Sequence, residues 1–408
     1  MAEADLHGNR HVLRRVVAAA SIAAALAGQA LAVRAAETNP LEGLKVSGEA
    51  YVDWSLTDIQ GEQDNAFSLN RGYLTVTKKM NDFLGFRYTL DVKQAATTED
   101  VEGSVSNALD GNYVFRTKYL YAEMNFGGEG ALSQLRGRVG MQHAGIDDFE
   151  QAMNPYRAQT KNWQEGASWF GTADLGVGLH GNFGGTLADA KARTGSSKYD
   201  GRHGSFQLLL ANGGGYDKTE KNDNKLLSGR VSLRPAADAL PGLQLTYGGV
   251  FGQDNTTNGD DGAGVDFTLH AFMLSWQSPR FTAYGQYFLA DNNQAGKYVT
   301  DEGAGVKTAG MSAFAMVRPN ALRDRLGLYA RFNTFDGDTD EVITAGDHGV
   351  TQVTGGVSYD VGKGNMFIVA YEATSYDPHA DAVGKLPSVE QLDRDDDTKL
   401  QIVYRLEF

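Results

Sequence analysis

From about residue 44 to the last residue, apolar and polar side chains alternate along the chain with a period of two. In the segment 84–93, for example, Leu84, Phe86 and Tyr88 alternate with Arg87 and Thr89. Neighbouring side chains of a β-strand point to opposite faces, so this pattern predicts strands with one apolar and one polar surface. The same alternation recurs in the segments 135–142, 227–233, 326–333 and 400–408.

The spacing of the alternating segments predicts sixteen strands. They are expected at 44–57, 66–79, 83–94, 112–126, 133–144, 168–182, 203–214, 225–235, 242–253, 265–277, 280–291, 306–318, 326–336, 350–361, 366–376 and 397–408.

The connections between these segments differ in length. Most connections after even-numbered strands are short, such as 81–82 and 278–279, whereas most after odd-numbered strands are long and polar, such as 95–111. The short link 58–65 and the long segment 183–202 are exceptions. Short turns at one rim and long loops at the other are typical of outer-membrane barrels, and a soluble sandwich has no reason to sort its loops in this way. An open sheet edge would leave backbone groups unsatisfied in hydrocarbon. We therefore predict an all-β fold, a 16-stranded antiparallel transmembrane β-barrel.

The N-terminal residues 1–32 have the pattern of a cleaved signal peptide. Arg10, Arg14 and Arg15 precede an Ala-rich apolar stretch at 16–31, and Ala30-Leu31-Ala32 is a small-x-small cleavage site. A short membrane anchor is the alternative, but the apolar stretch is marginal for spanning a bilayer. We expect residues 33–408 to form the barrel domain in the outer membrane of a Gram-negative bacterium.

The C-terminal strand ends on an aromatic residue. Tyr404, Leu406 and Phe408 share one apolar face, and Phe408 is the final residue. A terminal aromatic on an alternating strand resembles the recognition signal for barrel insertion, so we expect the barrel-assembly machinery to be a partner. A chance edge strand at the end of a globular chain is the alternative.

Composition excludes several classes of protein. The absence of Cys excludes disulfide scaffolds, Cys-ligated metal sites and thiol nucleophiles. With 37 Lys and Arg against 51 Asp and Glu, the net charge of −14 has the wrong sign for general nucleic-acid binding. Metalloprotease, nucleophile-elbow and P-loop motifs are absent from the sequence, so we expect no catalytic residues, no metal and no cofactor. The histidines of the mature chain are scattered singly, at His143, His180, His203, His270, His348 and His379.

Charged side chains within the strands are candidates to line a pore. A charge on the lipid face costs about 2–4 kcal/mol near the bilayer midplane, so these residues should face the lumen. Two interpretations are open: the charges pair with one another, or they form a basic track that conducts anions. Phe67 and Leu69 share the parity of Arg71, so Arg71 needs a bulge in its strand to face the lumen. The predicted pore-lining residues are Arg71, Arg87, Asp91, Lys93, Glu123, Arg136, Arg138, Arg230, Arg331, Glu372 and Arg405.

The segment 145–167 is the candidate constriction loop. It follows the fifth strand, where general porins fold their third loop into the lumen, and a plain extracellular loop is the alternative. Phe149, Tyr156 and Trp163 are candidates to anchor it against the barrel wall. Its charged residues are of both signs: Asp147, Asp148, Glu150, Arg157, Lys161 and Glu165.

Two further groups of residues have expected places. Acidic residues of other long loops, such as Asp254 and Asp338, form either solvated loops or a negative mouth that contacts lipopolysaccharide through divalent ions. Tyrosines near strand ends are expected to form girdles at the membrane interfaces: Tyr73, Tyr88, Tyr119, Tyr287 and Tyr359.

Two short stretches resemble a known family. Residues 67–76, FSLNRGYLTV, resemble the early-strand motif of the phosphate-selective porin O and P family, and residues 328–332, LYARF, look like another of its strands. The resemblance implies a 16-stranded, generally trimeric outer-membrane porin, in which Arg331 would correspond to a wall arginine. Phosphate selectivity in that family rests on an arginine ladder and a cluster of constriction lysines, for which Lys161 is the single candidate.

These observations together predict an outer-membrane porin that forms a passive, water-filled channel. Small hydrophilic solutes or ions would pass, with anions such as phosphate as candidates. Expected partners are outer-membrane lipid, lipopolysaccharide and two further copies in a homotrimer, and nucleic acid is excluded. One alternative is a barrel sheath around a partner protein, such as a multihaem cytochrome in an outer-membrane electron conduit. Another is an outer-membrane hydrolase, for which the sequence offers no convincing pair of Ser and His.

Overall fold

The computed structural model describes residues 41–94, 112–259, 262–300, 302–320, 324–343, 345–378 and 396–408. The chain divides into two units, Met1–Glu42 and Gly43–Phe408, and the second unit contains all the strands. The predicted signal peptide, 1–32, lies outside the described residues.

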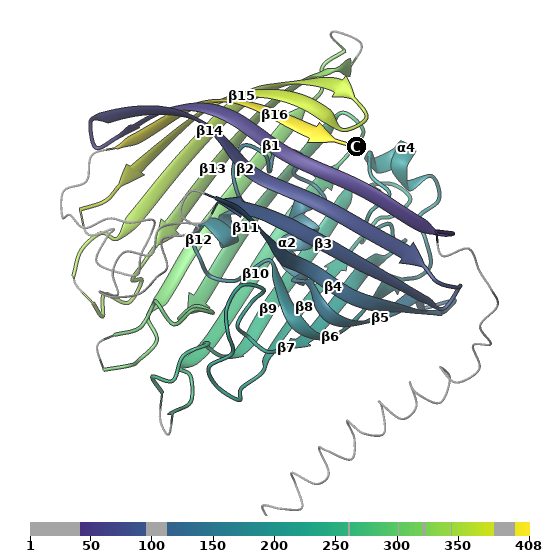
Figure 1. Ribbon diagram of the computed structural model, residues 1–408, viewed down its shortest axis with the longest axis horizontal. Helices are drawn as coiled ribbons and strands as arrows, with labels where there is room; N and C mark the ends of the chain where they lie inside the picture. Colours follow the sequence, from purple (N-terminus) through teal and green to yellow (C-terminus); the bar gives the residue numbers. More distant parts are fainter. Residues whose placement is uncertain are drawn as a thin grey trace, which may run out of the picture. The chain divides into compact units, whose positions relative to one another are not determined.

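The second unit is a closed antiparallel barrel (Figure 1). Each strand pairs with the next along the chain, and β1 pairs with β16 to close the ring. The predicted 16-stranded antiparallel β-barrel is therefore confirmed. The strands are β1 (Leu44–Ile59), β2 (Glu62–Lys79), β3 (Leu84–Gln94), β4 (Tyr113–Gly127), β5 (Leu132–His143), β6 (Ala173–Phe183), β7 (Gly204–Ala211), β8 (Leu226–Leu233), β9 (Leu243–Gln253), β10 (Asp266–Gln277), β11 (Phe281–Asp291), β12 (Lys307–Val317), β13 (Leu326–Asp336), β14 (Gly349–Gly362), β15 (Asn365–Tyr376) and β16 (Asp397–Glu407).

Three short helices lie in the described parts of the connections. Helices α2 (Gly145–Gln151) and α3 (Trp163–Gly166) belong to the connection between β5 and β6, and α4 (Ala190–Thr194) to the connection between β6 and β7. Within the described ranges, no helix is both long and apolar enough to cross a membrane.

Side chains on the outward face of the barrel are mainly apolar. Val177, Leu208, Phe272, Leu274 and Val357 alternate with inward residues and are 45–54% exposed. Apolar residues on the face that meets lipid and polar residues in the lumen are the expected pattern of a transmembrane barrel.

The expected tyrosine girdles need a correction. Tyr287 and Tyr359 lie on the outward face, at 42% and 39% exposed. Tyr73 and Tyr119 instead point into the barrel, where both line a cavity. Each pairs across strands with an inward residue, Tyr73 with Asp91 and Tyr119 with Thr89, so the parity of their strands places them in the lumen.

A β-bulge in β2 resolves the parity of Arg71. The pairing of β1 with β2 passes from Tyr51 opposite Arg71 directly to Val52 opposite Leu69, which leaves Asn70 as the extra residue. Such a bulge shifts the alternation by one residue. Arg71 therefore points inward, although Phe67, at 82% exposed, points outward from the same strand.

A second bulge, in β4, brings a lysine into the barrel. The pairing of β3 with β4 passes from Thr89 opposite Tyr119 to Leu90 opposite Thr117, so Lys118 is the extra residue. Lys118 is 2% exposed, and its ammonium group donates a hydrogen bond to the Tyr73 hydroxyl at 3.1 Å. Both Lys118 and Tyr119 thus face inward.

Candidate functional site

The connection 144–172 folds into the lumen. Trp169 Nε1 donates to Thr308 Oγ1 of β12 at 2.7 Å, and Gln159 Nε2 donates to Gln401 Oε1 of β16 at 3.3 Å. Glu165 contacts β2 through an ion pair. A single loop can touch strands on different sides of a closed barrel only from the inside, so this connection, which contains the candidate constriction loop 145–167, occupies the interior.

Apolar packing holds the loop against one side of the wall. Tyr156 stacks on Tyr329 of β13, with ring centroids 4.0 Å apart, and its hydroxyl lies 3.0 Å from Ser358 Oγ of β14. Trp169 is fully buried between Phe288 and Phe335. Each such buried aromatic side chain contributes about 1.5–3 kcal/mol. The loop and the inward faces of β10 to β14 therefore share a dry core.

Glu165 ties the loop to the opposite side of the wall. Its Oε1 lies 2.9 Å from Arg71 Nη2 on β2, and its Oε2 lies 2.7 Å from Arg157 Nη2 on the loop. Burial by itself would raise the pKa of Glu165, but the two guanidinium groups outweigh it and hold the pKa well below its usual value.

Asp148 is also held in place. His143 Nδ1 lies 2.9 Å from its Oδ1, and Tyr199 donates a short hydrogen bond to its Oδ2. Burial would raise the pKa of Asp148, but His143 and Tyr199 outweigh it and keep the carboxylate ionised.

The other two carboxylates of the loop are enclosed. Asn162 and Gln151 donate to Asp147, and burial raises the pKa of that carboxyl group. Tyr284 donates to Glu150 Oε1 at 2.9 Å, and burial again raises the pKa of the glutamate. All four carboxylates that the sequence offered for the constriction are thus held by protein groups.

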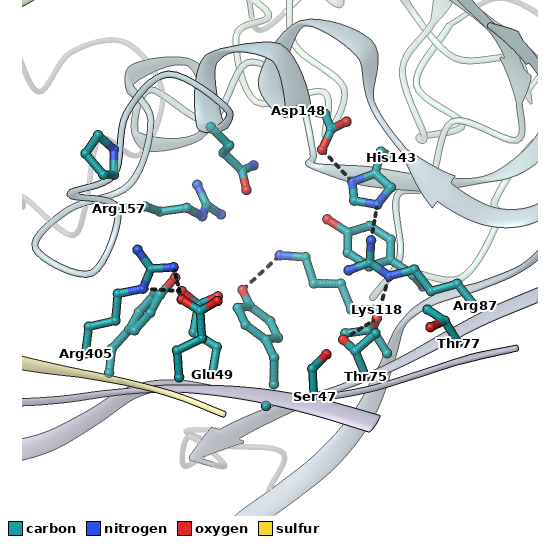
Figure 2. Close-up of a pocket in the computed structure, with 18 of the residues that line it drawn as sticks. Ser47, Glu49, Thr75, Thr77, Arg87, Lys118, His143, Asp148, Arg157 and Arg405 are labelled. Carbon is teal, nitrogen blue, oxygen red and sulfur yellow. Dashed lines mark hydrogen bonds and ion pairs between the residues drawn. The ribbon is translucent and has the colours of Figure 1, made fainter. Parts of the chain in front are cut away.

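A cavity of about 440 Å³ lies between the loop and the wall formed by β1 to β5 and β16 (Figure 2). Arg157 of the loop and Lys118 of the wall point toward one another across it. Arg87 hydrogen bonds to neutral groups, Thr89 Oγ1 at 3.0 Å and His143 Nε2 at 3.2 Å. Five lysine and arginine side chains line this cavity, and they are Arg87, Lys118, Arg157, Lys198 and Arg405. Three carboxylates also line it: Glu49, Asp148 and Glu407.

A second cavity, of about 370 Å³, adjoins the first along the β5 to β8 wall. The two cavities share Arg87, His143, Asp148 and Lys198. In the second cavity, too, lysines and arginines outnumber carboxylates. The lysine and arginine residues are Arg87, Arg136, Arg138, Lys198 and Arg230, and the carboxylates are those of Asp148 and Asp200.

The predicted pore-lining residues fall into three groups. Arg87, Arg136, Arg138, Arg230 and Arg405 line the two cavities. Arg71, Arg331 and Glu372 point inward but contact the loop: Arg331 donates to the Lys161 carbonyl at 2.6 Å, and Glu372 accepts from Gln159 at 3.0 Å.

The remaining charged residues pair with neighbouring strands. Asp91 forms an ion pair with Arg116, with Oδ2 and Nη2 2.7 Å apart. Glu123 forms an ion pair with Arg138, with Oε2 and Nε 2.8 Å apart. Lys93 is on β3, and its side chain lies outside the described part of the structure.

Sequence reasoning missed Lys118 and Arg116. In an unbroken β4 they would share the lipid face with Leu120, whereas Glu123 would face the lumen. Two cations at lipid parity are themselves a signal, because a bulge is the simplest way to turn them inward.

Two of the acidic loop residues expected at the mouth are buried. Asp254 and Asp338 are each 1% exposed. Asp254 accepts from Asn292 at 2.8 Å, and Asp338 accepts from the backbone N–H groups of Val342 and Ile343. These two side chains fix loop conformations. Across the described ranges, no three His, Asp or Glu side chains are grouped to hold a metal ion.

No family model and no curated protein matches the chain. Solved structures do match. OmpT of Vibrio cholerae has a TM-score of 0.55 at 11% identity, over 92% of this chain and 100% of that chain. An anion-selective porin from Comamonas acidovorans has a TM-score of 0.55 at 12% identity, over 90% and 99%. The outer-membrane channel DcaP of Acinetobacter baumannii has a TM-score of 0.53 at 11% identity, over 91% and 100%. The chain has the fold of the outer-membrane porins.

Proposed function

We propose that this protein is a passive outer-membrane channel that favours small anions. The observation that carries the proposal is the unequal use of charges around the lumen. Asp147, Asp148, Glu150 and Glu165 are bound by protein groups. Lysines and arginines outnumber carboxylates in the lining of both cavities, although Arg138, Arg157 and Arg405 each pair with a carboxylate. The net charge of −14 belongs to the whole chain, and selectivity depends on the groups beside the passage.

The position of Arg157 supports an anion preference. Its Nη2 binds Glu165, and its side chain lines the 440 Å³ cavity. Lys118 faces it across the cavity and donates to Tyr73. Donors that converge on a space with low-dielectric walls attract anions more strongly than the same groups in open water.

One solved structure with the same fold supports the proposal. One of the similar structures is described as an anion-selective porin. Phosphate is a candidate solute through the family resemblance. An enzyme is not proposed, since the ionisable groups of the lumen are arranged as ion pairs and a cationic wall.

The barrel sheath around a partner protein receives no support. The connection 144–172 packs against the wall and leaves cavities of about 440 and 370 Å³. Such volumes suit small solutes. The chain's own loop thus occupies the space that a partner would need.

Outer-membrane location and assembly as a homotrimer belong to the same proposal. The apolar outward face supports a lipid environment, with lipopolysaccharide in the outer leaflet. Sedimentation of the detergent-solubilised protein tests the trimer: a species of three chains is expected, and a monomer would contradict it.

Planar-bilayer recording of the refolded mature protein tests the channel. Under a KCl gradient we expect discrete conductance steps. The sign of the reversal potential should show that chloride permeates better than potassium. Lys118→Met should weaken that preference, whereas Lys363→Met, in the exposed turn between β14 and β15, should not. A correctly folded barrel without conductance would refute the channel. Steps with cation preference would refute the anion selectivity alone, and block by added phosphate would support a phosphate site.

A further inference from the structure

The connection between β6 and β7, residues 184–203, is unusually long for its rim. It follows an even-numbered strand, and the connections of that rim are short turns such as Asn81-Asp82 and Ser278-Pro279. Its helix α4 lies at the end of the barrel that also carries the C-terminus (Figure 1). In such barrels this is the periplasmic rim.

The base of this segment is a built structure. Leu187 N donates to the Asp200 carbonyl at 2.7 Å, and Arg202 N donates to the Gly185 carbonyl at 2.9 Å, so the two arms form a short hairpin. Leu187 and Ala190 are buried against Ala237 of the turn between β8 and β9.

Polar contacts fasten the segment to the neighbouring turns. Arg193 Nη2 donates to the carbonyls of Ala237 and Asp238, at 3.0 and 2.8 Å. Arg202 forms an ion pair with Asp238 at 2.7 Å. Gly195 lies against the turn between β10 and β11, where an added Cβ would be 3.0 Å from the Ser278 carbonyl oxygen. The segment therefore extends from β6 to the β10–β11 turn along the rim.

The far part of the segment enters the lumen below the loop. The Tyr199 hydroxyl binds Asp148 of the loop, and its ring lies 5.0 Å from Phe149. The Arg230 guanidinium lies 4.7 Å over both rings. Tyr199 thus joins the segment to the loop.

Lys198 stands next to this junction and is exposed. It lines both the 440 Å³ cavity and the 370 Å³ cavity, as Asp148 does. The carboxylate of Asp148 is bound by His143 and Tyr199. Lys198 therefore lies where the linings of the two cavities meet.

We propose that residues 184–203 are a second constriction element, and that Lys198 is a specificity-determining residue for anions at the exit. The inference rests on the proposed channel function. A lysine suits this role because its flexible, strongly hydrated point charge attracts anions without the fixed two-point hydrogen bonding of arginine.

Reversal potentials of charge variants test the proposal. Lys198→Glu changes the local charge by two units, which at about 7 Å shifts chloride and potassium in opposite directions and, with screening by about 0.15 M salt, should lower the chloride-to-potassium permeability ratio on the order of 5-fold. Lys198→Met should lower it by roughly the square root of that factor. Lys191→Glu is the matched control, because Lys191 belongs to the same segment and lines neither cavity.

The outcomes separate this inference from the proposed function. A conducting wild-type protein in which Lys198→Glu and Lys191→Glu behave alike would overturn the inference and leave the channel standing. A folded wild-type protein without conductance would overturn both. If Lys198→Glu fails to fold, the permeability ratio of Lys198→Met is compared with that of the wild-type protein instead.

A second variant tests the steric part. Tyr199→Ala removes the ring that lies beside Phe149 and the hydroxyl that binds Asp148. A rise in single-channel conductance is expected if the segment narrows the passage. An unchanged conductance would show that residues 184–203 do not constrict it.

Discussion

The ion pairs of Glu165 connect the inner loop to the wall on the β2 side, and Glu165→Gln would break both without changing the size of the side chain. The three side chains are mostly enclosed, at 14% exposed for Glu165, 12% for Arg71 and 7% for Arg157. Removal of the carboxylate leaves two buried guanidinium groups without their counter-charge. The dry core around Trp169 stays intact.

The expected magnitude follows from the burial of the pair. Removal of one partner of a buried ion pair costs about 3–5 kcal/mol. Each 1.4 kcal/mol is a factor of ten in an equilibrium, so the population of barrels with a released loop should rise roughly 10²- to 10⁴-fold. Because the folded pKa of Glu165 is lowered, this stabilisation is complete above the ordinary glutamate pKa and is lost only as pH falls through the lowered value. Measurements at pH 7 therefore record the full effect.

Thiol labelling measures the release of the loop. The chain contains no Cys, so Ala158→Cys introduces a single thiol at a loop position that is 3% exposed. Its labelling rate by a small water-soluble reagent should rise at least about 100-fold in the Glu165→Gln background. Glu129→Gln, in the exposed turn between β4 and β5, is the matched control. Labelling rates within a factor of about three, in folded barrels, would refute the assigned role of the ion pairs.

Three further predictions follow from other parts of the lumen and wall. Burial raises the pKa of Asp147 and Glu150, so these carboxyls take up protons at a higher pH than ordinary carboxyls do. Reversal potentials should show a stronger anion preference as pH is lowered, and the double variant Asp147→Asn, Glu150→Gln should lose that part of the change. Gly140→Val should cost about 1–3 kcal/mol in urea unfolding, since Gly140 has φ +127° and a Cβ there would collide with the backbone carbonyl oxygen of Leu120 on β4; an unchanged midpoint would contradict this. Trp169→Ala should cost about 3–5 kcal/mol in the same assay, and a loss below 1 kcal/mol would mean that the loop core is not close-packed.

The sequence was sufficient for the barrel because alternation is a local property. The strand 326–336 was predicted with both ends correct, and most other boundaries lie within about two residues of the observed ones. The sixth strand was predicted to begin at 168, but β6 begins at Ala173 because Trp169 and its neighbours belong to the inner loop. Periodicity alone does not separate a buried loop from a strand.

The candidate site was predictable only in part. The inner loop and the cationic wall follow from charge and parity, and the mixed parity of Phe67 and Arg71 pointed to a bulge that the pairing now contains. The bulge at Lys118 and the contact of Tyr199 with Asp148 depend on pairings between distant segments. The two cations at lipid parity, Arg116 and Lys118, are the local signal for the bulge, whereas the contact of Tyr199 with Asp148 has no signature within its own stretch of chain.

Strand β10, beneath the inner loop, is largely apolar on both faces, and this has a consequence for how the barrel finds its register. On β10, Phe267, Leu269 and Met273 lie inside at 0–3% exposed, while Phe272 and Leu274 lie outside at 49% and 54%. A shift of one residue in the pairing register of β10 would exchange its inward and outward side chains and still place apolar side chains against lipid. The bilayer therefore does little to fix the register of this strand. The directional bonds of the loop supply that guidance on neighbouring strands, through Trp169 to Thr308 and Trp163 to Thr334. The loop thus helps to fix the register of the strands that surround it.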